Sequence, residues 1–302
     1  MSIAARPVAA RASEVLADLI ARPLAPGLYL VATPIGNLGD ISLRALSVLA
    51  RADLIAAEDT RHSKKLLTHY GIAGTLTPYH EHNAERERPK LLARLKRGEA
   101  IALISDAGTP LVSDPGYKLV RAALDEGISV ISIPGASATL AALTSAGLPT
   151  DACMFAGFLP PKQGARRARL AELAAVPATL IFFETAPRLA KSLADMAEVL
   201  GAREGAVARE LTKLHETVTR GTLAELATQC GESEPLKGEL VVLVAPPSAD
   251  ETEASDDQII AALETALETE SLRDAVREVS ESLKAHRNRV YELGLKLSGK
   301  RG

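Results

Sequence analysis

The segment IALISDAGTPLVSDPGYKLVRAALDEGISVISIPGASA, residues 101–138, indicates an α/β fold. Apolar runs lie near both of its ends, at 101–104 and 128–133, and each run is followed by a loop of small residues. Strand, helix and strand in this order form a βαβ unit. Because neither run alternates with polar residues, both predict strands of a parallel sheet that is covered by helices on two faces.

The stretch between the two runs is expected to be a helix. Asp114 can cap it, Pro115 suits its first turn, and Gly127 suits its end. In parallel sheets, ligands bind beyond the carboxyl ends of the strands, which here are the loops 105–110 and 134–138. Either loop alone can be an ordinary turn, but the two at one sheet edge favour a small-molecule pocket.

The composition is that of a soluble globular protein, with 302 residues, 47% of them hydrophobic and 24% charged. A chain of this length exceeds one core, so two domains with appendages are expected. Aromatic residues make up 3% and Trp is absent, so platforms of the kind that stack single-stranded bases are not evident. With a net charge of -3, only local basic patches would attract nucleic acid.

Cysteine usage and hydropathy predict a cytoplasmic protein. Cys153 and Cys230 belong to no CxxC pair, which fits a reducing compartment and argues against a structural zinc or a disulfide framework. Glu14 and Asp18 interrupt any apolar region of a signal peptide. No apolar run approaches membrane-spanning length, and no metal is expected.

Shifts in composition divide the chain into five parts. In the second large part, strands are expected at 154–157, 178–183, 206–209 and 239–244, without strict alternation with helices. The five parts are a flexible arm at 1–26 with a short helix from Ser13 to Ala21, an N-terminal α/β lobe at 27–150, a mixed α/β lobe at 151–246, an acidic linker at 247–257 and a helix-turn-helix-like bundle at 258–302.

The first loop of the N-terminal lobe lacks the known phosphate-binding fingerprints. Residues 33–40 contain Gly36 and Gly39 without the G-x-G-x-x-G spacing, and the chain has no P-loop sequence. Glu58 and Asp59 follow the second predicted strand. The pocket therefore suits a neutral or positively charged ligand with an adenosine part, which small residues allow to approach the backbone closely.

Several longer motifs resemble known enzymes. Three resemble the tetrapyrrole methylase superfamily of S-adenosylmethionine-dependent enzymes, namely AEDTRHSKKLL at 57–67, SDAGTPLVSDPG at 105–116 and IPGASA at 133–138. Four are similar to the RsmI-type ribosomal RNA ribose 2'-O-methyltransferases, namely TPIGNLGD at 33–40, FFETAPRL at 182–189, RELTKLHE at 209–216 and KGELVVLV at 237–244. The resemblance runs from Gly27 to Val244, and the terminal bundle resembles the helix-turn-helix appendage of the same group.

The resemblance implies a two-lobed fold with a mainly parallel N-terminal sheet, a homodimer, and S-adenosylmethionine in the cleft between the lobes. For Asp106 a turn cap is the alternative interpretation, and for Pro34 a tight turn without a ligand. The residues implied as cofactor contacts are Pro34, Asp106, Ala107, Gly108, Leu111, Val112, Ser137, Ala138, Phe183, Leu211 and Lys237.

Methyl transfer is an in-line displacement that needs a positioned hydroxyl and an acceptor for its proton. Glu58 or Asp59 can be a general base or can orient one. Arg61 and Lys213 can hold RNA phosphates or lower the pKa of a neighbour. The alternative for all four is a structural ion-pair cluster, and the sequence does not single out one base.

A basic turn after the domain junction is the first candidate for RNA contact, because it is expected to border the cleft. Its residues are Lys162, Arg166, Arg167 and Arg169, which can equally form an ordinary solvated face. The resemblance implies methylation of the ribose 2'-hydroxyl of a cytidine in the decoding region of 16S rRNA. Two alternatives stay open, a precorrin-type tetrapyrrole methyltransferase and a non-catalytic RNA-binding factor in ribosome assembly.

Overall fold

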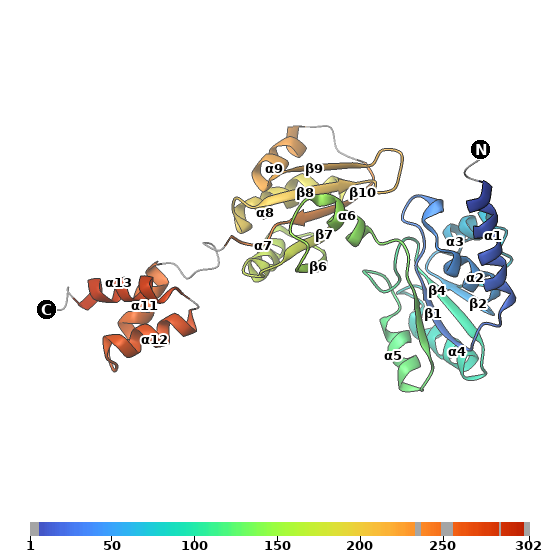
Figure 1. The fold of residues 1–302 in the computed structure, drawn as a ribbon, viewed down its shortest axis with the longest axis horizontal. Coiled ribbons are helices and arrows are strands. Elements are labelled where there is room, and N and C mark those ends of the chain that lie inside the picture. Colours follow the sequence, from blue (N-terminus) through green and yellow to red (C-terminus); the bar gives the residue numbers. More distant parts are fainter. Residues whose placement is uncertain (1–5, 233–236, 249–255, 284, 299–302) are drawn as a thin grey trace.

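The chain forms two α/β lobes followed by a small helical bundle (Figure 1). The structure is a computed structural model, and it describes residues 6–232, 237–248, 256–283 and 285–298. Each lobe is built on one five-stranded sheet. The expectation of a two-lobed α/β fold with a terminal helical bundle is confirmed.

The sheet of the N-terminal lobe has the strand order β3-β2-β4-β1-β5, and its neighbouring strands are parallel. All its carboxyl ends therefore meet at one edge, and the loops after β4 and β5 lie there together. Its strands are β1 (Gly27–Val31), β2 (Leu54–Ala57), β3 (Leu76–Pro78), β4 (Ala100–Ile104) and β5 (Val130–Ile133).

Helices cover both faces of this sheet, as its continuous apolar strands require. α2 (Leu43–Arg51) and α3 (Thr60–His69) pack on one face, and α4 (Ala84–Lys96) and α5 (Tyr117–Asp125) pack on the other. Asp59 caps α3 by accepting a hydrogen bond from the backbone N–H of its second residue. A short 3₁₀ turn lies between β1 and α2, in the first loop.

Helix α5 begins later than the sequence suggests. The expectation that Asp114 caps it and that Pro115 lies in its first turn is wrong, because the N-cap is Gly116, with φ 140°, and no side chain caps the helix. A Cβ at Gly116 would lie 2.9 Å from Leu103 Cδ2, so glycine allows this turn to approach the sheet closely. The residues before it stay outside the helix, and Asp114 can face the carboxyl edge of the sheet.

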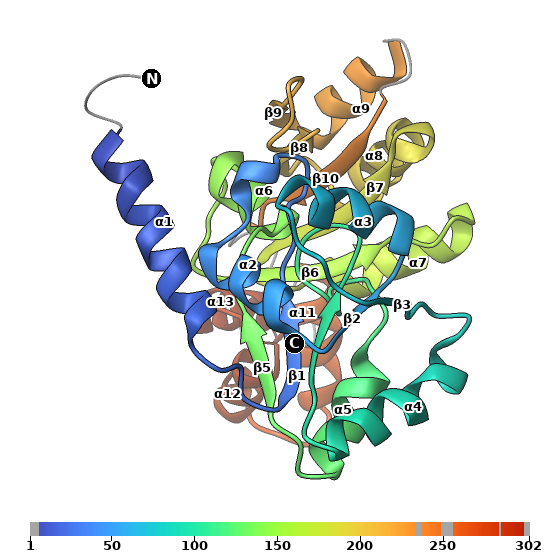
Figure 2. The same ribbon diagram turned by 90° about the vertical axis from the view of Figure 1, so that its right-hand side faces the viewer.

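The expected flexible arm contains a longer helix than predicted. α1 spans Arg6–Ala21, with Pro7 in its first turn, and it packs along α2 (Figure 2). Val15, Leu16 and Leu19 are half-buried. The predicted helix from Ser13 to Ala21 is therefore only the second half of α1. Residues 1–5 of the expected arm lie outside the described part of the chain.

The second sheet has the order β6-β7-β10-β8-β9, in which β6 and β7 are parallel and the other neighbours are antiparallel. Helices α7, α8 and α9 cover one of its faces. The edge strand β9 is absent from the sequence-based expectation. The elements are β6 (Cys153–Phe158), α7 (Gln163–Leu173), β7 (Thr179–Thr185), α8 (Leu189–Leu200), β8 (Glu204–Arg209), β9 (Thr217–Thr222), α9 (Leu223–Glu232) and β10 (Glu239–Val244).

The opposite face of the second sheet is covered by a helix that follows the last strand of the first sheet. This helix, α6, spans Ala138–Ala146, and Ser137 caps it by accepting from the Leu140 N–H. Its buried residues Ala142 and Leu143 pack with strands β7, β8 and β10. The expected lobe boundary at residue 150 therefore follows a helix that, by its packing, belongs to the second sheet.

The terminal bundle has an apolar core of its own. It consists of α11 (Asp256–Ala266), α12 (Leu272–Ser282) and α13 (Arg287–Ser298), in agreement with the three short helices expected there. Most of the expected linker at 247–257 lies outside the described residues, as do Lys284 and 299–302.

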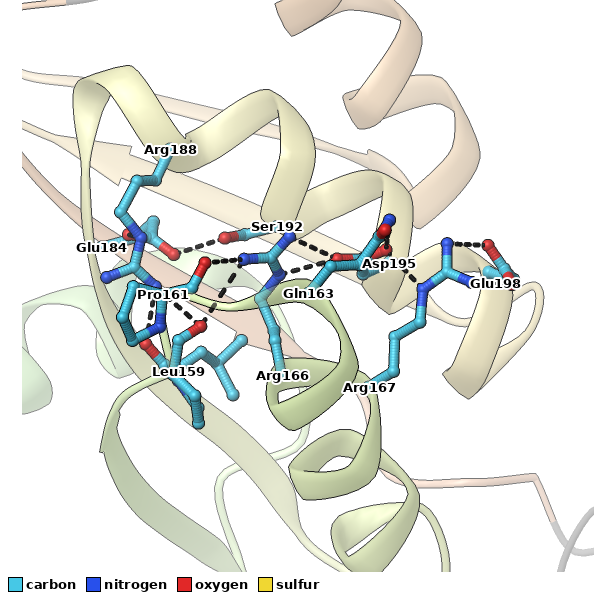
Figure 3. Close-up of polar contacts among 11 residues, drawn as sticks. Leu159, Pro161, Gln163, Arg166, Arg167, Glu184, Arg188, Ser192, Asp195 and Glu198 are labelled. Carbon is cyan, nitrogen blue, oxygen red and sulfur yellow. Dashed lines mark hydrogen bonds and ion pairs between the residues drawn. The ribbon is translucent and has the colours of Figure 1, made fainter.

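A buried ion-pair network joins α7 to α8 in the second lobe (Figure 3). Arg166 Nε donates to Asp195 Oδ2 over 2.6 Å, and Arg167 Nε donates to Asp195 Oδ1 over 2.7 Å. Burial alone would raise the pKa of Asp195, but hydrogen bonds from Arg167, Gln163 and Arg166 hold it below its ordinary value. Arg167 also pairs with Glu198.

The four basic residues predicted to contact RNA do not form one exposed patch. Arg166 is 4% exposed and is neutralised by a residue 29 positions away in the sequence. Arg167 is held by Asp195, and Arg169 pairs with Glu172 over 2.7 Å. Lys162 is exposed and, within the described ranges, takes part in no ion pair. The three arginines are therefore paired with carboxylates of α8 or of the next turn of α7, and RNA contact through this turn stays a prediction.

Replacing Arg166 by Met should lower the free energy of unfolding by about 3 kcal/mol, because it leaves a buried carboxylate short of a partner. Lys162→Met is the matched control, and it should change stability by less than about 0.5 kcal/mol. Urea unfolding followed by circular dichroism measures both. Equal stabilities of the two variants would contradict a structural role for Arg166.

Candidate active site

A cavity of about 630 Å³ lies between the two lobes. Its walls come from the loops after β1, β4 and β5, from the start of α6, and from the ends of β6, β7, β8 and β10. This volume is within the range of small-molecule sites in proteins. The residues predicted as cofactor contacts that line it are Ala107, Gly108, Val112, Ser137, Ala138, Phe183, Leu211 and Lys237.

Three residues predicted as cofactor contacts do not line this cavity. Pro34 and Asp106 border a separate cavity of about 30 Å³. The Asp106 carboxylate accepts a hydrogen bond from the Asp59 N–H over 3.0 Å at the start of α3, which corresponds to the alternative interpretation as a cap. Leu111 instead packs into the apolar core beneath α5.

Small residues form the wall where the loops after β1 and β4 meet. Gly108 N–H donates to Thr33 O over 3.0 Å, and Thr33 N–H donates to Gly108 O over 2.9 Å. Gly108 has φ 76°, and a Cβ there would lie 3.3 Å from Ile35. The glycine therefore allows the left-handed conformation and the close approach of the two loops at the cavity.

Three carboxylates at the cavity are absent from the predicted site, Asp114, Glu184 and Glu239. Glu184 is 3% exposed, accepts from the N–H of Thr185 over 2.8 Å and from Ser192 Oγ, and pairs with Arg188 over 3.3 Å. Its charge is thus neutralised by its own lobe. The FFETAPRL motif carried Glu184, but the spacing did not show which of its residues faces the cavity.

Asp114 is a carboxyl group without a cationic partner among the causes that set its pKa. Burial, the largest cause, raises this pKa to about 6, a hydrogen bond with Ser105 opposes the rise, and the charges of Glu58 and Asp106 add to it. The sequence pattern predicts Asp114 as a helix cap, so its position at the cavity could not be predicted from that pattern. It is a group able to exchange a proton near neutral pH.

The predicted catalytic residues of the first lobe lie beside the cavity rather than in its lining. Burial raises the pKa of Glu58, and the charge of Asp106 adds to the rise. Arg61 is exposed and pairs with Asp59 over 2.9 Å. Hydrogen bonds from Arg61 lower the pKa of Asp59 to about 2, so this carboxyl group stays ionised.

Lys213, the fourth predicted catalytic residue, lies where the two lobes touch. Its Nζ donates to Glu210 Oε1 over 2.9 Å and to Glu239 Oε2 over 3.2 Å. A Cβ at Gly36 would lie 2.5 Å from Lys213 Cγ, so only glycine allows the first loop to pass over this side chain. Asn37 N–H donates to Thr212 Oγ1 over 3.1 Å at the same contact.

Strained backbone conformations gather in two loops at the cavity. Among the described residues other than glycine, positive φ angles occur at Leu111, Ser113, Glu210 and Thr212, with values of 74°, 66°, 50° and 66°. One pair lies in the loop after β4 and the other in the loop after β8. Such conformations cost about 1–3 kcal/mol each and are typical of functional sites.

Neither a membrane span nor a metal cluster is present in the described ranges. Their helices are too short or too polar to cross a lipid bilayer. No three His, Cys, Asp or Glu side chains in these ranges are grouped so that they could hold a metal ion.

Replacing Asp114 by Asn should stabilise the protein above pH 6. The folded-state pKa of about 6 exceeds the ordinary 3.8, so ionisation becomes increasingly unfavourable to folding as pH rises between these values. A shift of about 2 units corresponds to ~3 kcal/mol, and partial exposure to solvent reduces the expected gain to about 1 kcal/mol. Urea unfolding at pH 7.5 and at pH 4 measures it.

The gain should be absent at pH 4, where the carboxyl group is protonated in the folded state. Asp125→Asn, at the exposed end of α5, is the control and should have little effect at either pH. An equal effect of Asp114→Asn at both pH values would show that the charge of Asp114 is not the cause.

Family models match both main parts of the chain. The model described as tetrapyrrole (corrin/porphyrin) methylases matches residues 27–227, and the model described as the RsmI C-terminal HTH domain matches residues 253–298. The first match includes the carboxyl-edge loops and most of the second sheet. The second match includes all three helices of the terminal bundle.

Solved structures with the same fold have low sequence identity. A conserved hypothetical protein from Aeropyrum pernix K1 has a TM-score of 0.58 at 16% identity, covering 92% of this chain and 98% of that chain. Uroporphyrin-III C-methyl transferase from Thermus thermophilus, complexed with S-adenyl homocysteine, has a TM-score of 0.51 at 23% identity, covering 72% and 96%. These likenesses show the fold alone.

Curated relatives are closer in sequence. Ribosomal RNA small subunit methyltransferase I of Mesorhizobium japonicum is 58% identical over 82% of this chain and 84% of its own length. The enzyme of the same name from Pseudomonas aeruginosa is 48% identical over 90% of this chain and 98% of its own length. The chain therefore belongs to the tetrapyrrole methylase family and, within it, to the ribosomal RNA small subunit methyltransferases I.

Proposed function

We propose that this protein transfers a methyl group from S-adenosylmethionine to the ribose 2'-hydroxyl of a cytidine in the decoding region of 16S rRNA. The observation that carries the proposal is the cavity between the lobes, which the family motifs line. The names of the relatives, ribosomal RNA small subunit methyltransferase I, support the small ribosomal subunit as substrate. A homodimer, which the family resemblance implies, and a cytoplasmic location, which cysteine usage and hydropathy predict, are parts of the same proposal.

The cavity suits S-adenosylmethionine in size and chemistry. Phe183, Leu211 and Val241 supply an apolar wall for an adenine ring, and Gly108 adds a part of the wall that has no side chain. Asp114 supplies a negative charge, which suits a sulfonium cation. Bound S-adenosylmethionine supplies an activated methyl group to the acceptor oxygen.

The residues of this chain have to orient the acceptor hydroxyl and receive its proton. We assign the proton to the Asp114 carboxylate, because it lines the cavity and titrates near neutral pH. Glu58 lies within electrostatic reach of Asp114 and raises its pKa. Lys213 pairs with Glu210 and Glu239 of its own lobe, and its side chain lies against Gly36 in the first loop of the other lobe. These roles make Asp114 and Lys213 the residues whose replacement should lower the transfer rate.

Helix α3 offers a basic face for the RNA backbone. Lys64 and Lys65 are exposed on it, and neither takes part in an ion pair within the described residues. Arg61, at the start of the same helix, is 90% exposed at its side chain but is paired with Asp59, so the free cations of this face are the two lysines. Phosphate contacts need free cations. This face therefore replaces the arginines of α7 as the proposed RNA contact, with Lys162 kept.

A tetrapyrrole substrate is the weaker candidate. A small macrocycle fits the fold of the family, but it gives no role to the terminal helices that match the RsmI C-terminal HTH domain. A non-catalytic role does not explain the strained loops at the cavity or the raised pKa of Asp114.

Methyl transfer from labelled S-adenosylmethionine to small subunits purified from cells that lack this modification tests the proposal. We expect label on one ribose 2'-oxygen in the decoding region, which nuclease mapping and mass spectrometry locate. Asp114→Asn should lower the transfer rate at least tenfold while S-adenosylhomocysteine still binds. The wild-type protein leaving both naked 16S rRNA and small subunits unlabelled would reject the proposal.

Lys64→Glu with Lys65→Glu should weaken binding of the small subunit and reduce its salt dependence by about one unit of slope for each lost phosphate contact. Lys191→Glu, an exposed lysine of α8, is the control and should leave binding unchanged. Filter binding at several salt concentrations gives both quantities. Unchanged affinity of the double variant would remove α3 from the RNA contact.

A further inference from the structure

One phenylalanine lies exposed at the mouth of the cavity. Phe158 is 52% exposed, lines the cavity, and is the last residue of β6. The chain has four phenylalanines and no tryptophan. Exposing one of these few large aromatic rings to water gives up the free energy that its burial would contribute. The exposure of Phe158 therefore needs an explanation in the geometry of β6.

The explanation is a β-bulge in β6. Along the parallel pairing with β7, Phe155 is opposite Ile181 but Gly157 is opposite Phe182, so Ala156 is an extra residue. Gly157 has φ 68°, a conformation that residues with a side chain adopt at a cost. A bulge of this kind interrupts the ladder and turns the strand, and bulges are common next to active sites.

The bulge exchanges the two faces of the strand. Met154 packs into the core beneath α7 and α8, and regular alternation would place Phe158 in the same core. After the bulge, Phe158 is opposite Phe183, which faces the cavity. The extra residue thus takes an aromatic ring out of the core and places it on the cavity side.

Arginines of the ion-pair network of α7 and α8 also bind the backbone of the loop that follows Phe158. Arg188 donates to the carbonyl oxygen of Leu159, and Arg166 Nη1 donates to the carbonyl oxygen of Pro161 over 3.1 Å (Figure 3). Two prolines follow each other in this loop, which further restricts its backbone. The ring is therefore carried by a preorganised segment.

The surroundings of the ring decide what it can receive. Phe183, which also lines the cavity, contacts it edge to face at 5.6 Å between centroids, and about half of Phe158 stays exposed. A Cβ at Gly157 would lie 3.7 Å from Ser113 Oγ, so this end of β6 adjoins the loop of Asp114. A planar ligand on Phe158 would thus lie next to the proposed proton acceptor.

We propose that Phe158 forms a nucleobase-stacking subsite, which receives the base of the nucleotide whose ribose is methylated. The proposal rests on the proposed function, and it adds the residue that positions the acceptor. Every base has an apolar face, and stacking on an aromatic ring contributes without reading the sequence. In this arrangement S-adenosylmethionine binds inside the cavity, and the base of the RNA nucleotide stacks on the exposed ring of Phe158.

Phe158→Ala tests the subsite in the full-length protein. We expect kcat/KM for small subunits lacking the modification to fall about tenfold to a hundredfold, the range of base stacking on aromatic side chains. The dissociation constant of S-adenosylhomocysteine, measured by calorimetry, should change by less than about twofold. Thermal unfolding checks that the variant is folded, and the exposure of the ring predicts little change there.

Two further substitutions separate stacking from apolar packing. Phe158→Trp keeps an aromatic face and should retain transfer within about threefold, whereas Phe158→Leu keeps an apolar side chain and should lose nearly as much as Phe158→Ala. Leu124→Ala is the matched control, because Leu124 is 53% exposed near the end of α5 and away from the cavity.

Four results would overturn the inference. Transfer by Phe158→Ala within twofold of the wild type, with Leu124→Ala alike, removes the subsite while the proposed function stands. Weaker S-adenosylhomocysteine binding that accounts for the whole loss assigns Phe158 to the donor. If Phe158→Ala no longer self-associates in analytical ultracentrifugation, Phe158 belongs to a contact between two copies of the chain. Inactivity of the wild-type protein itself rejects the proposed function, and the subsite with it.

Discussion

The packing of α6 on the second sheet is the contact on which the cavity depends. The helix follows directly from the last strand of the first sheet, but Ala142, Leu143 and Ala146 are buried against the second. Ile35, from the first loop, joins the same core. Because these apolar contacts lock the start of α6 between the two sheets, the loops of one lobe face the strand ends of the other. Separation of the lobes would expose this core to water, so the cavity is maintained by the hydrophobic effect.

The cavity is surrounded by conformations and charges that oppose folding. Leu111 and Ser113 on one lobe, and Glu210 and Thr212 on the other, have left-handed backbone conformations. Asp114 keeps a carboxyl group in a place that raises its pKa. The two large cores of the lobes and the buried ion pairs of α7 and α8 offset these costs. The cores and buried ion pairs therefore supply the stability, whereas the residues at the cavity reduce it.

Patterns local in the sequence predicted the elements, and contacts between distant residues decided the site. The parallel sheet, its loops and most cavity contacts follow from apolar runs and motifs. Strand β9 is half-exposed and polar, so no alternation signals it. For the basic turn at 162–169, charge alone does not reveal the pairing of Arg166 with Asp195, which a later helix supplies. Asp114 was assigned to a cap, because nothing local shows that Ser113 adopts a positive φ.

The bulge in β6 makes the length of this strand as important as its composition. Ala156 is a small, half-buried residue that packs against the core beneath α7 and α8. Its deletion would restore regular alternation and turn the following aromatic ring into the core beneath α8, where space is already filled. Relatives of this enzyme should therefore tolerate substitution at this position far better than loss or gain of a codon. Selection should therefore remove in-frame deletions at this position more strictly than substitutions of its side chain.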